Sequence, residues 1–134
     1  MNTYDILKTR NAKVNFLKGL IRVSMSDGVV PDVEKEFYRK SAYGLGLDDE
    51  AVAEIENSDY KEIVFETTEE KMFFFIQAIQ LSWIDNDYCE AERKEIRKLA
   101  DELEISVESI EKVEKWVEEG MEWNKKGDEL LKLS

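Results

Sequence analysis

The chain of 134 residues carries 31 acidic against 19 basic side chains, so its formal net charge at pH 7 is −12. A surface of that sign repels the phosphates of nucleic acids and anionic lipids, and we therefore expect no nucleic acid among the partners. A hydrophobic fraction of 43% excludes a disordered acidic tail and predicts one packed domain over residues 1–134.

Catalytic chemistry has little support in the composition. Histidine is absent and Cys89 is the one cysteine, which removes the commonest general base, an intrachain disulfide and a cysteine zinc site. We expect no enzyme, and a metal-assisted hydrolase is the least favoured class because no nucleophile is evident. No signal peptide is evident, and the apolar run 72–84 is too short for a bilayer, which predicts a soluble cytoplasmic protein.

The first half of the chain has helical periodicity. Apolar residues recur at three- and four-residue spacing and predict a helix over about residues 11–26. A second helix is predicted over about residues 31–45, with Pro31 in its first turn. Asp48 is the expected N-cap of a short third helix that ends near residue 56.

The second half begins with a capping box, in which Thr67 is followed three residues later by Glu70. The helix that follows, to about residue 84, is apolar nearly all round and should be the most buried element. A further helix is predicted over residues 88–103, and Ser106 is the expected cap of a longer last helix.

The two halves are copies of one passage. Residues 16–56 align with residues 74–114 at a displacement of 58 positions without a gap, and eleven of the 41 pairs are identical. Two copies are too few for a solenoid. We therefore predict an all-α, single-domain bundle of about six to seven helices built from two pseudo-symmetric halves.

Each copy carries acidic residues at the junction of its first two helices. An Asp is followed by Gly or Asn, and further acids stand five and seven positions after the Asp. Carboxylate oxygens are the ligands that Ca²⁺ and Mg²⁺ prefer, although the glycine and glutamate of an EF-hand loop are missing. The candidate metal ligands are Asp27, Asp32, Glu34, Asp85, Asp87, Glu90 and Glu92.

These acids have a structural interpretation as well. Acidic residues in the first turn of a helix interact favourably with its dipole, and Asp tolerates the backbone angles of a turn. Residues two apart on a helix point to different faces, so Asp32 and Glu34 cannot bind one ion unless the helix begins between them. From the residues alone, capping and turn formation is the favoured interpretation.

The duplicated passage resembles the tellurite-resistance TerB-like family over about residues 12–117. The first copy matches through a short set of residues: Asp27, Gly28, Glu34, Ala42 and Leu45-Gly46-Leu47. The second copy matches through Asp85, Glu92, Ala100, Leu103 and Ile105, with Asn86 in place of the glycine. The resemblance implies an all-helical fold of two pseudo-symmetric halves.

The resemblance also implies a function. Members have acidic loop residues thought to bind divalent cations, and they occur in stress-response and membrane-associated complexes. Carried over to this chain, the implied ligands are Asp27, Glu34, Asp85 and Glu92, with Asp32, Asp87 and Glu90 as helpers. The implied cation is Ca²⁺, Mg²⁺ or Mn²⁺, and peripheral association with a membrane complex is a further expectation.

Residues 118–134 extend past the duplicated passage. Exposed tryptophan and methionine are enriched at protein interfaces, which makes Trp116, Met121 and Trp123 interface candidates. The alternative is a segment that folds back across the bundle as a capping helix.

Two functions from different classes remain favoured. The first is a non-enzymatic TerB-like domain of a bacterial stress response that binds or senses a divalent cation. The second is an acidic interaction or scaffold module that binds a basic surface of a protein partner, with loops that are purely structural.

Overall fold

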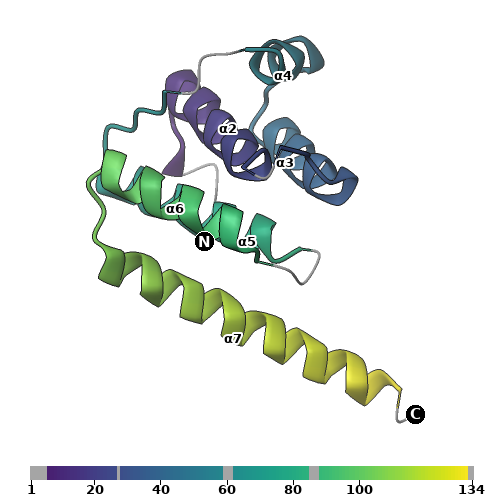
Figure 1. Ribbon diagram of the computed structural model, residues 1–134. Coiled ribbons are helices and arrows are strands. Elements are labelled where there is room, and N and C mark those ends of the chain that lie inside the picture. The colour runs from purple at the N-terminus through teal and green to yellow at the C-terminus, as the bar shows by residue number, and fades with distance from the viewer. Residues whose placement is uncertain (1–5, 27, 59–61, 85–87, 133–134) are drawn as a thin grey trace.

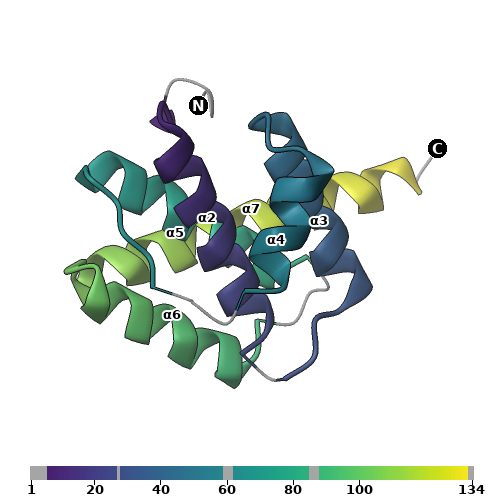
Figure 2. The same cartoon turned by 90° about the horizontal axis from the view of Figure 1, so that it is seen from above.

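The computed structural model describes residues 6–26, 28–58, 62–84 and 88–132. This part of the chain forms six α-helices and no strand (Figures 1 and 2). The helices are α2 (Arg10–Ser24), α3 (Asp32–Gly44), α4 (Asp49–Glu56), α5 (Thr68–Ser82), α6 (Glu90–Glu102) and α7 (Val107–Leu131). The predicted all-α bundle is confirmed.

The helix boundaries follow the repeat in the sequence. Helices α5 and α6 begin and end 58 residues after α2 and α3, and α7 begins 58 residues after α4. One detail differs from the prediction, because Pro31 is the N-cap of α3 and not part of its first turn. Its extended backbone precedes the helix, which begins at Asp32.

Side-chain caps fix several of these boundaries, as predicted. The Asp48 carboxylate accepts the backbone N–H of Ala51 at 2.8 Å. Thr67 and Glu70 form the expected capping box at the start of α5. The Ser106 hydroxyl oxygen accepts the backbone N–H of Ser109 at 3.1 Å. Such caps pair backbone groups that a helix end leaves unsatisfied.

Helices α2 and α5 are the central pair of the bundle. They pack against one another, and each also contacts α3 and α6; α4 packs on α2, and α7 packs on α5. The rings of Phe16 and Phe73 stack at 5.5 Å, and Phe74 meets Phe16 edge-on at 6.5 Å. The predicted central position of α5 is confirmed, but α5 is not the most buried helix, because nine residues of α2 and eight of α5 are buried.

Gly19 allows the close approach of α2 and α5. A Cβ atom at this position would lie 2.3 Å from Cε1 of Phe74, well inside van der Waals contact. The Phe74 ring is fully buried and is held between other aromatic rings. Glycine is therefore needed at position 19 by the packing of its neighbour.

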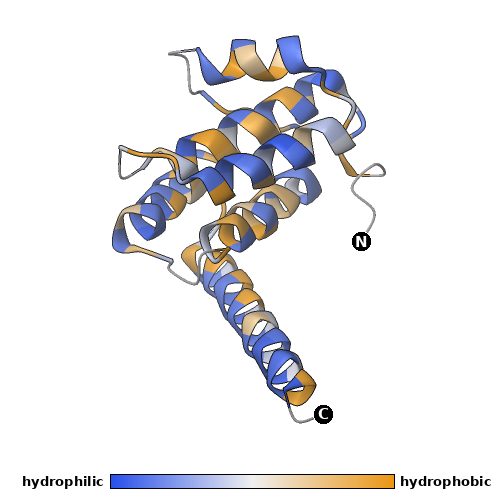
Figure 3. Ribbon diagram, turned by 90° about the vertical axis from the view of Figure 1, so that its right-hand side faces the viewer, coloured by the Kyte–Doolittle hydropathy of each residue, from blue (hydrophilic) through white to orange (hydrophobic). Residues whose placement is uncertain are grey.

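Helix α7 runs along one side of the bundle and continues past it, so its C-terminal part projects away from the other helices (Figures 1 and 3). Ile110, Val113 and Val117 are buried, whereas residues 122–131 are exposed. The alternative in which this segment folds back across the bundle is wrong. Among the helices described, none combines the length and the apolar character that crossing a membrane requires.

Candidate functional site

The predicted metal ligands fall into two groups. Asp27, Asp85 and Asp87 lie outside the described residues. The other four occupy the first turns of α3 and α6, where Asp32 corresponds to Glu90 and Glu34 to Glu92 in the repeat: Asp32, Glu34, Glu90 and Glu92.

Within each first turn the two acids face different ways. Asp32 and Glu90 are exposed, while Glu34 and Glu92 retain only 2% and 5% of their accessible surface. Because the helices begin at positions 32 and 90, each pair lies two residues apart inside a helix and diverges. The structure therefore does not bring the two acids of one copy together.

Glu92 has a structural role that explains part of its burial. Its carboxylate accepts the backbone N–H of Cys89, the N-cap of α6, at 3.3 Å. Burial raises the pKa of the Cys89 thiol, so the thiol is less readily ionised than an exposed one. Within the described ranges no three Cys, Asp or Glu side chains are close enough to hold a metal ion.

Two other carboxylates are bound by several donors, and the sequence patterns did not single them out. The first carboxylate cluster consists of Tyr38, Arg39 and Glu56. The Tyr38 hydroxyl donates to Glu56, and Nη2 of Arg39 lies 3.0 Å from Oε2 of the same carboxylate. This cluster ties α3 to α4.

The second carboxylate cluster consists of Tyr88, Arg93, Arg97 and Glu114, and it ties α6 to α7. Nη2 of Arg97 lies 2.6 Å from Oε1 of Glu114. Oε2 accepts the Tyr88 hydroxyl at 2.7 Å and Nη1 of Arg93 at 3.2 Å. The Arg93 guanidinium also lies 4.4 Å from the centre of the Tyr88 ring, a cation–π contact.

The ion pair at the centre of both clusters is duplicated. Arg39 and Glu56 correspond to Arg97 and Glu114, and both pairs are identical in the repeat. The tyrosines come from non-equivalent positions, 38 and 88, so the repeat does not relate them to one another. Both carboxylates are already hydrogen-bonded by two or more donors, which suits a structural connection between helices better than ligand binding.

The clusters change the acid–base properties of their tyrosines. Burial and the hydrogen bond to Glu56 raise the pKa of Tyr38, and burial and the hydrogen bond to Glu114 raise the pKa of Tyr88. In both, an ionised phenol would lose its hydrogen bond and stand beside a carboxylate. Neither tyrosine is therefore suited to act as a base at neutral pH.

The surface next to the first acidic turn is partly apolar. Met25, Val29 and Val33 are 45%, 71% and 41% exposed, around the end of α2 and the start of α3. Beside them is an open hollow of about 440 Å³, whose lining includes Lys35 and Glu56. This combination of apolar and charged groups is typical of protein contact surfaces.

The interface candidates at the C-terminal end differ in exposure. Trp116 and Trp123 are 54% and 75% exposed, while Met121 is partly buried against the core. The two tryptophans are therefore available for contact, and Met121 is less so.

Comparison of the chain with protein-family models, with curated proteins and with solved structures gave no match.

Proposed function

We propose that this chain is a non-enzymatic TerB-like domain that binds a divalent cation, Ca²⁺, Mg²⁺ or Mn²⁺, through its acidic inter-helix loops. Its cellular role would be the sensing or binding of that cation in a bacterial stress response. The observation that carries the proposal is the duplication itself, because both copies keep carboxylates at the same positions where α3 and α6 begin.

Pseudo-symmetry of the two halves is part of the proposal. Support comes from the helix boundaries, which repeat after 58 residues, and from the helix contacts, since α2 meets α6 as α5 meets α3. Phe16 and Phe74, which are equivalent in the repeat, touch one another across the central pair. Equivalent residues meet in this way where two units are related by a twofold axis.

A bound cation would act on stability. A site formed by Asp27 and Asp85 with the buried Glu34 and Glu92 would bring several negatively charged groups close together. A cation bound by such groups offsets their repulsion and favours the folded state over the unfolded one. Occupancy of the site would then be coupled to the stability of the bundle.

The direct test is calorimetric titration of chelator-treated protein with each cation, compared with the Asp27→Asn, Asp85→Asn double variant. We expect saturable binding by the unmodified chain and at least about a ten-fold weaker affinity in the variant, since each carboxylate is a charged ligand. A control with Glu54→Gln and Asp101→Asn removes the same charge elsewhere and should bind normally. Equal affinity in all three proteins would contradict the assignment.

An acidic interaction module is the second candidate. It is favoured by the exposed Met25, Val29 and Val33, which adjoin the exposed carboxylate of Asp32. Such a surface fits a partner that presents basic and apolar groups together. Binding would weaken with added salt and would not require a cation, which separates it from the first candidate.

A further inference from the structure

The C-terminal part of α7 is a helical arm with few contacts of its own. From Glu118 to Leu131 every residue is exposed except Met121, which is partly buried. Isolated helices of this length are marginal in water, and glycine weakens them further. The arm contains two glycines and still forms one uninterrupted helix with the buried part of α7.

The exposed Trp116, Trp123 and Leu130 lie in one row along α7, and the exposed Leu131 lies beside it. Trp116, Gly120, Trp123, Gly127 and Leu130 follow one another at intervals of four, three, four and three residues. This is the spacing of the contact positions of a coiled coil. We call these five residues the Trp–Gly row.

The two glycines of the row have no explanation within the described part of the chain. A Cβ atom at Gly120 or Gly127 would meet nothing within 4 Å, in contrast to Gly19, where it would meet Phe74. Both glycines lie beside exposed tryptophans, with Trp116 54% and Trp123 75% accessible. The row thus alternates large side chains with gaps.

The arm carries charges of both signs. Residues 118–131 contain two lysines and five acidic residues, a net charge of −3. This net charge opposes the approach of a second copy, so electrostatic attraction has to come from individual pairs of opposite charge.

We propose that the arm is a homodimerisation surface, in which α7 packs antiparallel against α7 of a second copy of this chain. In an antiparallel pair, one register places Trp116 opposite the partner's Gly127. In an antiparallel pair, the residue numbers of opposite positions add up to one constant sum. The same register therefore places Trp123 opposite the partner's Gly120. Each indole then fills the gap at a glycine, and four such contacts form around the twofold axis.

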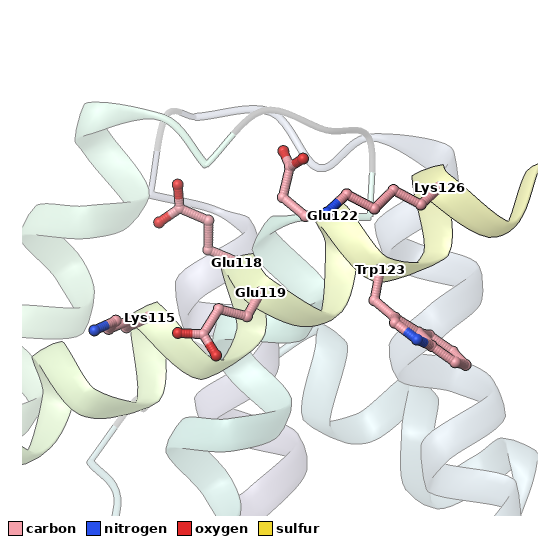
Figure 4. Close-up of a pocket in the computed structure, with 6 residues that line it drawn as sticks. All are labelled: Lys115, Glu118, Glu119, Glu122, Trp123 and Lys126. Carbon is pink, nitrogen blue, oxygen red and sulfur yellow. The ribbon is translucent and has the colours of Figure 1, made fainter. Parts of the chain in front are cut away.

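The charges beside the row agree with this register. Glu119 and Lys126 flank the row on the same side of the helix. In the antiparallel register, Glu119 lies next to the partner's Lys126, and Lys126 lies next to the partner's Glu119. Figure 4 shows Glu119 and Trp123 projecting to one side of α7, while Glu118 and Glu122 project to the other and the Lys126 side chain extends toward Glu122. Pairing with the partner's Glu119 requires the exposed Lys126 side chain to turn away from Glu122. The flank on the other side of the row carries the uncharged Asn124 and Leu131.

A parallel pair fits the row less well. It would place tryptophan opposite tryptophan and glycine opposite glycine, so that large groups collide in one layer and leave a gap in the next. A fully buried indole covers about 150–250 Å², but Trp116 and Trp123 are only 54% and 75% exposed before the pair forms. The area that the four indoles bury in the antiparallel pair therefore stays below the roughly 1,000 Å² of a stable specific interface, and we expect a weak dimer with micromolar affinity.

Sedimentation equilibrium in the presence of EDTA tests the proposal without involving any cation site. The unmodified chain should pass from monomer to dimer between about 1 and 200 µM. Glu119→Lys and Lys126→Glu should each raise the dissociation constant about ten-fold or more. Each substitution places two like charges next to one another at both symmetry-related contacts of the dimer. The double variant Glu119→Lys, Lys126→Glu should restore the affinity of the unmodified chain.

Glu118→Lys is the matched control, since it makes the same change of charge on the other side of the helix and should leave the dimer intact. Circular dichroism establishes that every variant keeps its helix content. A monomer at all concentrations would overturn the proposal. So would a dimer that ignores both single substitutions, or a double variant that remains as weak as either single one.

Discussion

At the scale of single residues, the carboxylates of the two clusters differ in environment from the acids in the first turns of α3 and α6. Glu56 and Glu114 accept from tyrosine and arginine donors, whereas Asp32 and Glu90 at the starts of α3 and α6 are exposed and Glu92 accepts a backbone N–H at the start of α6. A carboxylate bound by several charged donors connects the elements that supply them. The carboxylates of Glu56 and Glu114 therefore serve the packing of helices, whereas those of Asp32 and Glu90 are exposed to solvent.

Glu114→Gln should lower the free energy of unfolding by about 1–3 kcal/mol, because it leaves the donors of Arg93 and Arg97 without a charged acceptor. Glu56→Gln should lower the free energy of unfolding by less, because a single arginine, Arg39, pairs with the Glu56 carboxylate. Urea unfolding measures both values, with Glu111→Gln as the exposed control on α7. A larger loss at Glu56 than at Glu114 would contradict the donor-based account.

Tyr38 and Tyr88 should ionise well above the ordinary tyrosine pKa of 10. A raised pKa in the folded state means that the hydrogen-bonded phenol contributes stability below pH 10, which is lost as the pH rises through the folded pKa. In absorbance titration at alkaline pH, these two tyrosines should ionise only as the protein unfolds. Tyr38→Phe with Tyr88→Phe should remove that late component, and its persistence would refute the assignment.

At the scale of helices, local sequence signals placed most boundaries well. Thr67 with Glu70, Asp48 and Ser106 were identified as caps because capping depends on residues within one turn, and all three are confirmed. Pro31 was misplaced by one position, since its fixed backbone angle suits both the N-cap and the first turn.

The ion pairs of the two clusters could not be predicted in the same way. Arg39 and Glu56 are 17 residues apart, as are Arg97 and Glu114, and they meet only once two helices have packed. Their identity in both copies was visible in the sequence and was the one signal that pointed to them. The extent of α7 was also difficult to predict, because glycine weakens an isolated helix, yet α7 continues through Gly120 and Gly127 without a break.

Gly19 and Gly120 should respond in opposite ways to alanine. Gly19→Ala should destabilise the fold by about 1–3 kcal/mol, because the added methyl group overlaps the Phe74 ring. Gly120→Ala has open space in the monomer and should stabilise α7 by about 0.5–1 kcal/mol through helix propensity.

The same Gly120→Ala variant should weaken the proposed dimer, because its methyl group occupies the gap meant for the partner's Trp123. Thermal unfolding of dilute monomer and sedimentation equilibrium measure the two effects separately. A variant that stabilises both the monomer and the dimer would show that the Trp–Gly row is not a contact surface.

At the scale of the whole molecule, one arginine connects the two halves. Arg22 on α2 donates to Glu95 and Glu102 on α6, and its Nη1 lies 2.9 Å from Oε2 of Glu102. The hydrogen bond from Arg22 holds the pKa of Glu102 below its ordinary value. The bundle is therefore joined across the halves by charge as well as by the aromatic residues of α2 and α5.

Arg22→Gln should lower the melting temperature at pH 7, and the difference from the unmodified chain should shrink on acidification. A depressed carboxyl pKa contributes stability above the unfolded-state pKa, which is lost as the pH falls through the folded-state value. Melting curves recorded from pH 7 down to the titration range of glutamate test this. A difference that grows as the pH falls would contradict the stated role of Glu102.

The central claim is that the duplicated acidic loops bind a divalent cation. Thermal unfolding of chelator-treated protein in millimolar Ca²⁺, Mg²⁺ or Mn²⁺, compared with a monovalent salt of equal ionic strength, tests it most directly. We predict that one of these ions raises the melting temperature beyond the salt control, and that Asp27→Asn with Asp85→Asn abolishes the rise. Equal melting temperatures in every ion and in the salt control would contradict the claim.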